Sequence, residues 1–159
     1  DTDGSAEWQG KLLGGPNRIS MDFFANQASK CVQLSYNGPD TGDEDAIVPV
    51  AVLQHDMESC EVVPKPGFIA EYFPEDYEDA VIPEGIEPDI VRTEKQLDFE
   101  EVETPWQGLP ARYGGPFAAR FTTYINVTCG DAKKAKYQFM LESGMKAILY
   151  INGERACVE

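Results

Sequence analysis

The sequence predicts an all-β protein in which antiparallel strands form a β-sandwich or barrel. Three observations predict this fold class. Apolar and polar residues alternate in short runs, turn signals rich in Gly and Pro separate the runs, and no window carries a helical stripe with capping residues. At 159 residues with 42% hydrophobic content, the chain is long enough to bury a sizeable core as one domain.

The predicted strands follow one another along most of the chain. The period-two runs lie at residues 19–23, 32–36, 117–127, 137–141 and 149–151. Turn signals at 14–16, 37–39, 114–116 and 152–153 separate them. Since successive side chains of a strand point to opposite faces, each run is expected to bury one face.

The two ends of the sequence resemble parts of one interrupted β-segment. Residues 147–159, AILYINGERACVE, predict a strand, an Asn-Gly turn and a returning strand. Residues 1–8, DTDGSAEW, predict an acidic turn with no strand in front of it. When residues 1–8 are placed after residues 147–159, the two form one continuous β-segment. This indicates that the chain begins and ends in the middle of a fold. The missing strands then come from the other end of the same chain or from a neighbouring copy.

The chain divides into two β-rich segments, residues 1–53 and 67–159. Residues 54–66, QHDMESCEVVPKP, are polar and end in proline, which predicts a linker in which His55 is exposed. Residues 75–88 are acidic and irregular and predict a long surface loop.

The charge of the chain argues against two classes of partner. A net charge of −15 repels nucleic acid and anionic membranes. No apolar run approaches the ~20 residues that span a bilayer, so membrane insertion is not expected. With no signal peptide and no initial Met, the sequence is interpreted as a mature or trimmed product.

The cysteines and one sequon point outside the cytosol. The four cysteines, an even number, predict two disulfides in an oxidising compartment, with three pairings possible and four buried thiols as the alternative. Asn126-Val127-Thr128 is a glycosylation sequon, and Asn126 is expected to point outward from its strand. Together with the acidity, these features predict an extracellular, secreted glycoprotein. The cysteines are Cys31, Cys60, Cys129 and Cys157.

Chemistry-bearing motifs are sparse, so neither an enzyme nor a bound cofactor is predicted. The chain has one histidine and no Cys-x-x-Cys pair, which argues against zinc. It has no nucleophile–base constellation and no phosphate-binding glycine loop, and its many paired carboxylates are interpreted as solvated acidic loops. Trp8, Trp106, Tyr113 and Phe117 are expected in the core or an interface rather than on a sugar-stacking platform.

Five segments, in order, carry a resemblance to a known family. Residues 67–73, 89–99, 106–110, 117–127 and 137–154 resemble the fourteen-kilodalton protective-antigen domain, a β-sandwich module of toxins, glycosidases and yeast adhesins. The remaining parts of the family pattern resemble the front of this chain, at residues 1–4, 8, 15–24, 31–39 and 47–53. The resemblance therefore implies a circularly permuted domain, or one period of a tandem array.

Lectin members of that family bind calcium through two adjacent aspartates, and the resemblance places Gly144 and Met145 at those positions. Neither residue supplies a side-chain oxygen, so the usual calcium site is not expected. Asp1, Asp3 and Glu142 are weak candidates for a rebuilt site.

The interrupted order and the linker predict a structural subunit of an extracellular homopolymeric fibre or surface layer. Residues 1–53 of one copy would complete residues 67–159 of another, and the partners would be other copies of the chain. The expected contact residues are Asp1, Trp8, Cys60, Cys157 and Glu159. The alternative is a secreted carbohydrate-binding module, folded in cis without the usual calcium site, with glycans as partners.

Overall fold

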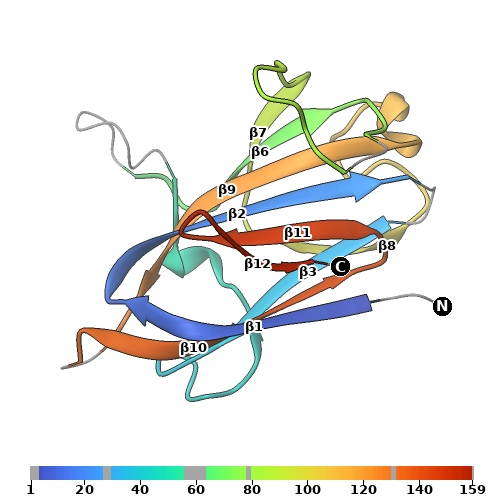
Figure 1. The fold of residues 1–159 in the computed structure, drawn as a ribbon. Helices are drawn as coiled ribbons and strands as arrows, with labels where there is room; N and C mark the ends of the chain where they lie inside the picture. Colours follow the sequence, from blue (N-terminus) through green and yellow to red (C-terminus); the bar gives the residue numbers. More distant parts are fainter. Residues whose placement is uncertain (1–3, 27–29, 56–63, 78–79, 130–131, 159) are drawn as a thin grey trace.

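The protein is a β-sandwich of two antiparallel sheets packed face to face, which confirms the predicted fold class (Figure 1). The computed structural model describes residues 4–26, 30–55, 64–77, 80–129 and 132–158. Within these ranges there are twelve strands, two short 3-10 segments and no α-helix. No helix in these ranges has the length and apolar character needed to cross a membrane.

The first sheet, called sheet A here, has five strands, and the second, sheet B, has seven. Sheet A contains β1 (Gly4–Leu13), β10 (Lys134–Ser143), β3 (Lys30–Asn37), β4 (Ala46–Ile47) and β8 (Asp98–Val102). Sheet B contains β12 (Glu154–Val158), β11 (Lys146–Ile151), β2 (Gly15–Ala25), β9 (Phe117–Val127), β6 (Phe68–Phe73), β7 (Ile90–Glu94) and β5 (Leu53–Gln54). The 3-10 segments are Val50–Val52 and Ala111–Gly114.

The core lies between the sheets and follows the predicted period of two. In β9 every second side chain from Phe117 to Val127 is at most 3% exposed, and Asn126 on the opposite face is exposed. The alternate residues of β10 and β3 are buried in the same way. Each fully buried large apolar side chain stabilises the fold by about 1.5–3 kcal/mol relative to exposure.

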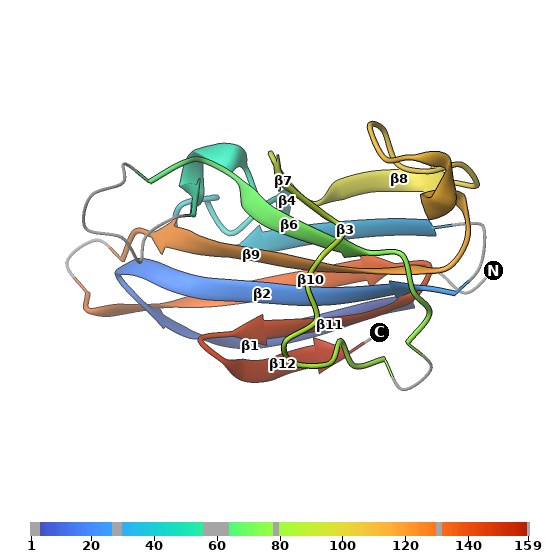
Figure 2. The ribbon, with the colours of Figure 1, turned by 90° about the horizontal axis from the view of Figure 1, so that it is seen from above.

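A second, smaller core lies on the outer face of sheet B. The stretch between β6 and β7 crosses that face (Figure 2). It buries Ala80 and Ile82 against Phe24 and Ile148 of the sheet. The predicted surface loop at 75–88 is therefore fixed to the sheet at two apolar residues.

The head of the chain is not the turn that the sequence predicted. Residues 1–3 lie outside the described residues, but residues 4–8 already belong to β1, which pairs with β10 along its whole length. The prediction was wrong because the alternation of exposed Ser5 and Glu7 with Ala6 and Trp8 suits a half-buried strand. Pairing with a neighbour thus outweighs the weak strand propensity of Gly and Ser.

The tail forms the predicted hairpin. Asn152 and Gly153 have φ angles of 51° and 82°, as a two-residue turn of type I′ requires. The Asn152 side-chain oxygen accepts a hydrogen bond from the backbone N–H of Arg18 (2.9 Å), which fixes the turn to β2.

The two β-rich segments interleave in both sheets. Strand β2 lies between β11 and β9, and β3 lies between β10 and β8. Within the described residues, β1, β2 and β3 thus pair with strands of the second segment of the same chain. Strands β1 and β12 are edge strands in contact with each other, and β1 begins at the end of the sandwich where β12 ends (Figures 1 and 2).

Candidate functional site

The two halves of the chain join at a strand that is interrupted by an insertion. β5 and β6 both run antiparallel to β9 on the side away from β2, so they run in the same direction. β5 pairs with residues 124–125 of β9, and β6 pairs with residues 118–122. Extending the β6 register by one residue places Phe68 opposite Thr123. Residues 55–67 are therefore an insertion in one otherwise continuous strand.

The alternation of side chains also continues across this junction. Leu53 and Phe68 are buried, and Gln54 and Ile69 are partly buried. Joining Gln54 directly to Phe68 would therefore keep every side chain on its present face, because successive residues of a strand alternate between faces.

Hydrogen bonds close the base of the insertion. The backbones of His55 and Lys65 exchange two hydrogen bonds, of 2.8 and 3.1 Å. The Thr123 hydroxyl donates to the Gly67 carbonyl at 2.7 Å and lies 3.1 Å from the carbonyl oxygen of Gln54. Thr123 thus bridges the two strand ends at the point where the chain leaves and re-enters the sheet.

His55 is buried, with 4% of its surface exposed, so the prediction of an exposed histidine was wrong. Its Nε2 lies 3.4 Å from the Thr93 hydroxyl. The linker composition misled the prediction, because His55 forms an isolated antiparallel β-bridge with Lys65.

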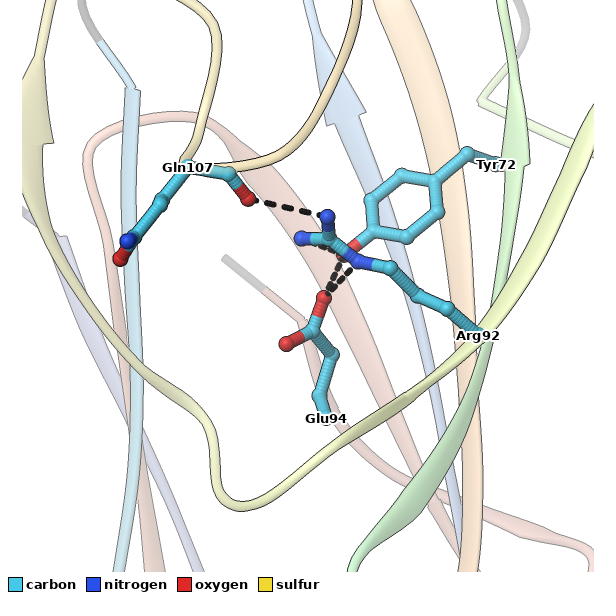
Figure 3. Close-up of polar contacts among 4 residues, drawn as sticks. All are labelled: Tyr72, Arg92, Glu94 and Gln107. Atoms are coloured by element: carbon cyan, nitrogen blue, oxygen red, sulfur yellow. Dashed lines mark hydrogen bonds and ion pairs between the residues drawn. The ribbon is translucent and has the colours of Figure 1, made fainter.

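A polar cluster occupies the corner where β7 of sheet B approaches β8 of sheet A. The Arg92 guanidinium lies over the Tyr72 ring, 5.1 Å from its centroid, and donates to the Gln107 carbonyl at 2.9 Å. Its Nε also donates to Glu94 Oε1 (2.5 Å). The same oxygen accepts a hydrogen bond from the Tyr72 hydroxyl at 2.6 Å, so one carboxylate oxygen joins two strands (Figure 3).

Beside this cluster lies a polar hollow of about 530 Å³, called the seam hollow here. The second carboxylate oxygen of Glu94 points away from Tyr72 (Figure 3) and has no hydrogen-bond partner among the described residues. Phe99 forms part of the wall and stacks on Trp106, with 4.1 Å between ring centroids. The hollow therefore combines hydrogen-bond donors, an acceptor and an aromatic wall. Its lining residues are Arg92, Thr93, Glu94, Lys95, Gln96, Asp98, Phe99 and Gln107.

The hydroxyl of Tyr72 gives the fold a dependence on alkaline pH. Burial, and then the neighbouring Glu94 charge, raise the pKa of Tyr72 well above its ordinary value of 10.0. Above pH 10 the unfolded chain loses this proton and the folded chain keeps it, so stability falls as the pH rises. We expect Tyr72→Phe to reduce that slope by up to ~1.4 kcal/mol per pH unit, measured by urea unfolding between about pH 9 and 11. An unchanged slope would contradict the assignment.

The glycosylation candidate is placed as predicted. Asn126 is exposed on β9 between buried Ile125 and Val127, so it points outward from sheet B. Modification of Asn126 by a glycan stays a prediction.

The positions of Cys31 and Cys129 exclude one of the three possible disulfide pairings. The Cys31 sulfur accepts a hydrogen bond from the Gly144 N–H (3.1 Å), just after β10, while Cys129 lies near Leu12, opposite the start of β10. The ten-residue strand β10 separates the two cysteines, a span far beyond the reach of a disulfide. No disulfide joins two cysteines of the described part of the chain. Cys60 and the side chain of Cys157 lie outside it, so full oxidation stays a prediction, with two pairings left.

Of the weak metal-ligand candidates Asp1, Asp3 and Glu142, the structure describes only Glu142. Glu142 is exposed on β10 and shares a hollow of about 250 Å³ with Glu100 and Glu101. The described ranges contain no group of three or more His, Cys, Asp or Glu side chains placed to hold a metal ion. Asp1 and Asp3 lie outside these ranges. Met145 packs against the main core instead of facing a ligand.

Of the predicted contact residues, only Trp8 has a described side chain. It is partly buried and packs on Phe139, with ring centroids 5.9 Å apart, so it covers the core of its own chain. Cys157 lies on β12, which contacts β1. Asp1, Cys60 and Glu159 lie outside the described residues.

The sequence analysis did not single out the seam hollow or the junction. Arg92 and Glu94 stand two residues apart in a strand, which places them on one face, and this signal could have found half of the cluster. The hydrogen bond between Tyr72 and Glu94, and the alignment of β5 with β6, depend on contacts between residues that are distant in the sequence.

In comparisons with known proteins, the chain matches no protein-family model, no curated protein and no solved structure. The resemblance to the protective-antigen domain and the permuted order of its halves therefore stay predictions, whereas the sandwich fold rests on the structure.

Proposed function

We propose that the chain is a structural subunit of an extracellular homopolymeric fibre or surface layer. In this assembly, residues 1–53 of one copy complete the sandwich of residues 67–159 of the next copy. The observation that carries the proposal is the insertion at residues 55–67. Because β5 and β6 form one continuous line of pairing along β9, β5 can come from the same chain as β6 or from a neighbouring chain.

Neither half forms complete sheets alone. Without β2, strands β11 and β9 lose the strand that pairs with both, and without β3 the same holds for β10 and β8. Residues 67–159 alone would expose open edges and a bare apolar face, which favours association. The contacts made by β1–β3 are the same in cis and in trans, so exchange changes only the path of the insertion.

The insertion is long enough, when extended, to connect successive sandwiches in an open polymer. A fully extended segment of ~13 residues spans up to ~45 Å, enough to connect neighbouring sandwiches. A head-to-tail contact that does not close into a ring produces a filament. The contact between the edge strands β1 and β12 supports the same proposal, because a permuted or tandem arrangement requires the start of β1 and the end of β12 to lie at the same end of the sandwich (Figures 1 and 2).

A complementation experiment tests exchange between chains. Residues 1–53 are called the donor half here, and residues 67–159 the acceptor half. Phe23→Asp places a charge in the donor half, and Phe121→Asp places one in the acceptor half. Both phenylalanines are fully buried, so each substitution is expected to disrupt the half that carries it. Each variant alone is expected to lack a cooperative unfolding transition, because it buries an unpaired charge. When the two are refolded together, one intact sandwich per pair is expected, visible as half of the wild-type unfolding amplitude.

The control for this experiment mixes the two variants after separate refolding. Recovery only on co-refolding supports exchange. If co-refolding gives no transition, residues 1–53 cannot act between chains, and the proposal is overturned.

The seam hollow favours a second candidate function, a secreted carbohydrate-binding module that is folded in cis. Sugar hydroxyls both donate and accept hydrogen bonds, and sugar rings pack on aromatic walls. Arg92 and Glu94 supply a donor and an acceptor, and Phe99 supplies the wall.

Substitution of Glu94 tests this second function. Glu94→Gln is expected to weaken binding to any glycan that an array identifies by about 10- to 100-fold, because a hydrogen bond to a charged group contributes ~1.5–3 kcal/mol. Glu154→Gln, an exposed carboxylate on β12, serves as the control and should bind as the wild type does. An array without any bound glycan, or equal loss in both variants, would argue against this function.

A further inference from the structure

Exposed apolar side chains lie on the loop that crosses the outer face of sheet B and on the strand that follows it. Four large apolar residues are strongly exposed in the described ranges, and three of them lie on the loop that crosses this face or on β7, to which it leads. These are Val81 (62% exposed), Ile86 (45%) and Val91 (59%). Isolated exposed apolar residues are ordinary, whereas clustering on one face marks an interaction surface.

The loop that presents this cluster is held firmly. Ala80 and Ile82, on either side of Val81, are 5% and 4% exposed and pack on Phe24 and Ile148 of the sheet. Val81 therefore points to solvent from an anchored backbone. Such a preorganised contact loses little conformational entropy on binding.

A hollow of about 420 Å³ lies beside Val81 and has an unequal charge distribution. Asp22 and Arg120 form an ion pair within it, with Nε–Oδ1 and Nη2–Oδ2 distances of 2.7 and 3.1 Å. Lys146 on β11 and Arg155 on β12 also line the hollow, and neither forms an ion pair within the described part of the chain.

The acidic side of the same face is formed by the loop. Glu84 lines the hollow and Glu87 follows the exposed Ile86, and both carboxylates are exposed. Within the described ranges, neither forms an ion pair. The face therefore presents a basic side on the sheet, an acidic side on the loop and apolar side chains on that same loop.

We propose that this face binds the same face of a second copy of the chain about a two-fold axis. The rotation places the basic side of each copy over the acidic side of the other and brings the exposed apolar residues together. A face that contains both signs of charge beside an apolar patch is complementary to itself. On a chain with a net charge of −15, a purely acidic partner would use only Lys146 and Arg155 and would be repelled by the loop.

This contact is independent of the proposed strand exchange. All of its exposed apolar and unpaired charged residues belong to the 67–159 half, whereas Asp22 and Phe24 beneath them belong to β2. None lies at the junction around residues 55–67. Exchange would extend a fibre along its axis, and the two-fold contact would pair fibres side by side.

Charge reversal in two chains tests the contact. Chain X carries Lys146→Glu with Arg155→Glu, and chain Y carries Glu84→Lys with Glu87→Lys. The Asp22–Arg120 ion pair stays in both chains. The other named charges of the face become acidic in X and basic in Y, so each chain is expected to repel itself. We expect the dissociation constant for self-association, measured by sedimentation velocity at low salt, to rise at least tenfold in X alone and in Y alone. An equimolar mixture of X and Y is expected to restore association.

Matched control variants distinguish an effect specific to this face from a general effect of changing surface charge or apolarity. Lys11→Glu with Lys136→Glu reverses two exposed cations on sheet A and should associate as the wild type does. Val81→Asp should weaken association, whereas Leu13→Asp, at a residue of similar exposure on β1, should not. Each dissociation constant is compared with that of the wild type and with that of the X and Y mixture. If strand exchange does not occur, it is absent from all of these samples, so the differences between their dissociation constants remain.

Three results would overturn the proposal. The first is association of X or Y that equals that of the wild type. The second is a mixture of X and Y that associates no better than either chain alone, which would assign the face to a different partner. The third is equal loss of association in the sheet A control.

Discussion

A chain in which residues 55–67 are deleted and Gln54 is joined to Phe68 is expected to fold as a self-contained sandwich that exchanges no strands and forms no fibre. The deletion makes β5 and β6 one strand along β9, with each side chain on its present face. Because no tether remains, residues 1–53 can reach only the acceptor half of the same chain. Closing a shorter loop also reduces the entropic cost of completing the sandwich in cis.

Negative-stain electron microscopy and sedimentation of the native and deleted chains measure this effect, with circular dichroism to establish that the sandwich is retained. A variant that replaces residues 56–63 with a Gly/Ser segment of equal length is the control, and it should polymerise as the native chain does. Fibres from the deleted chain would show that exchange at this junction is not the basis of assembly. A deleted chain that fails to fold would contradict the continuous-strand interpretation of the junction.

Trp106→Ala is expected to lower the free energy of unfolding by about 3–5 kcal/mol, the usual range for removing a large aromatic side chain from a core. Trp106 is 3% exposed and stacks on Phe99, and its ring also contacts Phe23 and Phe117 at centroid distances of 5.1 and 5.3 Å. Phe23 belongs to the donor half, so the substitution leaves a cavity where the two halves meet.

Thermal and urea unfolding measure the loss caused by Trp106→Ala. At ~2–4 °C per kcal/mol for a chain of this size, the melting temperature should fall by roughly 6–20 °C. The indole Nε1 makes no hydrogen bond within the described part of the chain, so the effect reports packing. Leu13→Ala, on an exposed side chain, should stay within about 0.5 kcal/mol of the wild type. A loss below about 1 kcal/mol in Trp106→Ala would mean that the surrounding rings collapse into the space.

The strands with a clear period of two could be predicted from sequence. In β9 every second residue from Phe117 to Val127 is buried, and of the residues between them only Ala118 is buried as well, so the buried face was evident. The Asn-Gly turn could be predicted because both of its residues accept positive φ angles. These features depend on residues close together in the chain.

What the sequence did not predict depends on contacts between distant residues. β1 begins with residues of weak strand propensity and is held by its register with β10. The buried position of His55 depends on its pairing with Lys65 across the insertion. In the seam cluster, the β6–β7 register pairs Tyr72 with Ile90 and Phe68 with Glu94. The Tyr72 hydroxyl therefore reaches Glu94 diagonally along the ladder, a contact that no local pattern encodes.

The continuity of the ladder across residues 55–67 leaves the length of that insertion free to vary during evolution. Gain or loss of residues between His55 and Lys65 would leave the registers of β5 and β6 on β9 unchanged. In an exchanged polymer the same segment would span the gap between successive sandwiches, so each added residue would lengthen the repeat by at most ~3.3–3.6 Å. Spacing and extensibility of the material could then drift, or be engineered, while the sandwich itself stays constant.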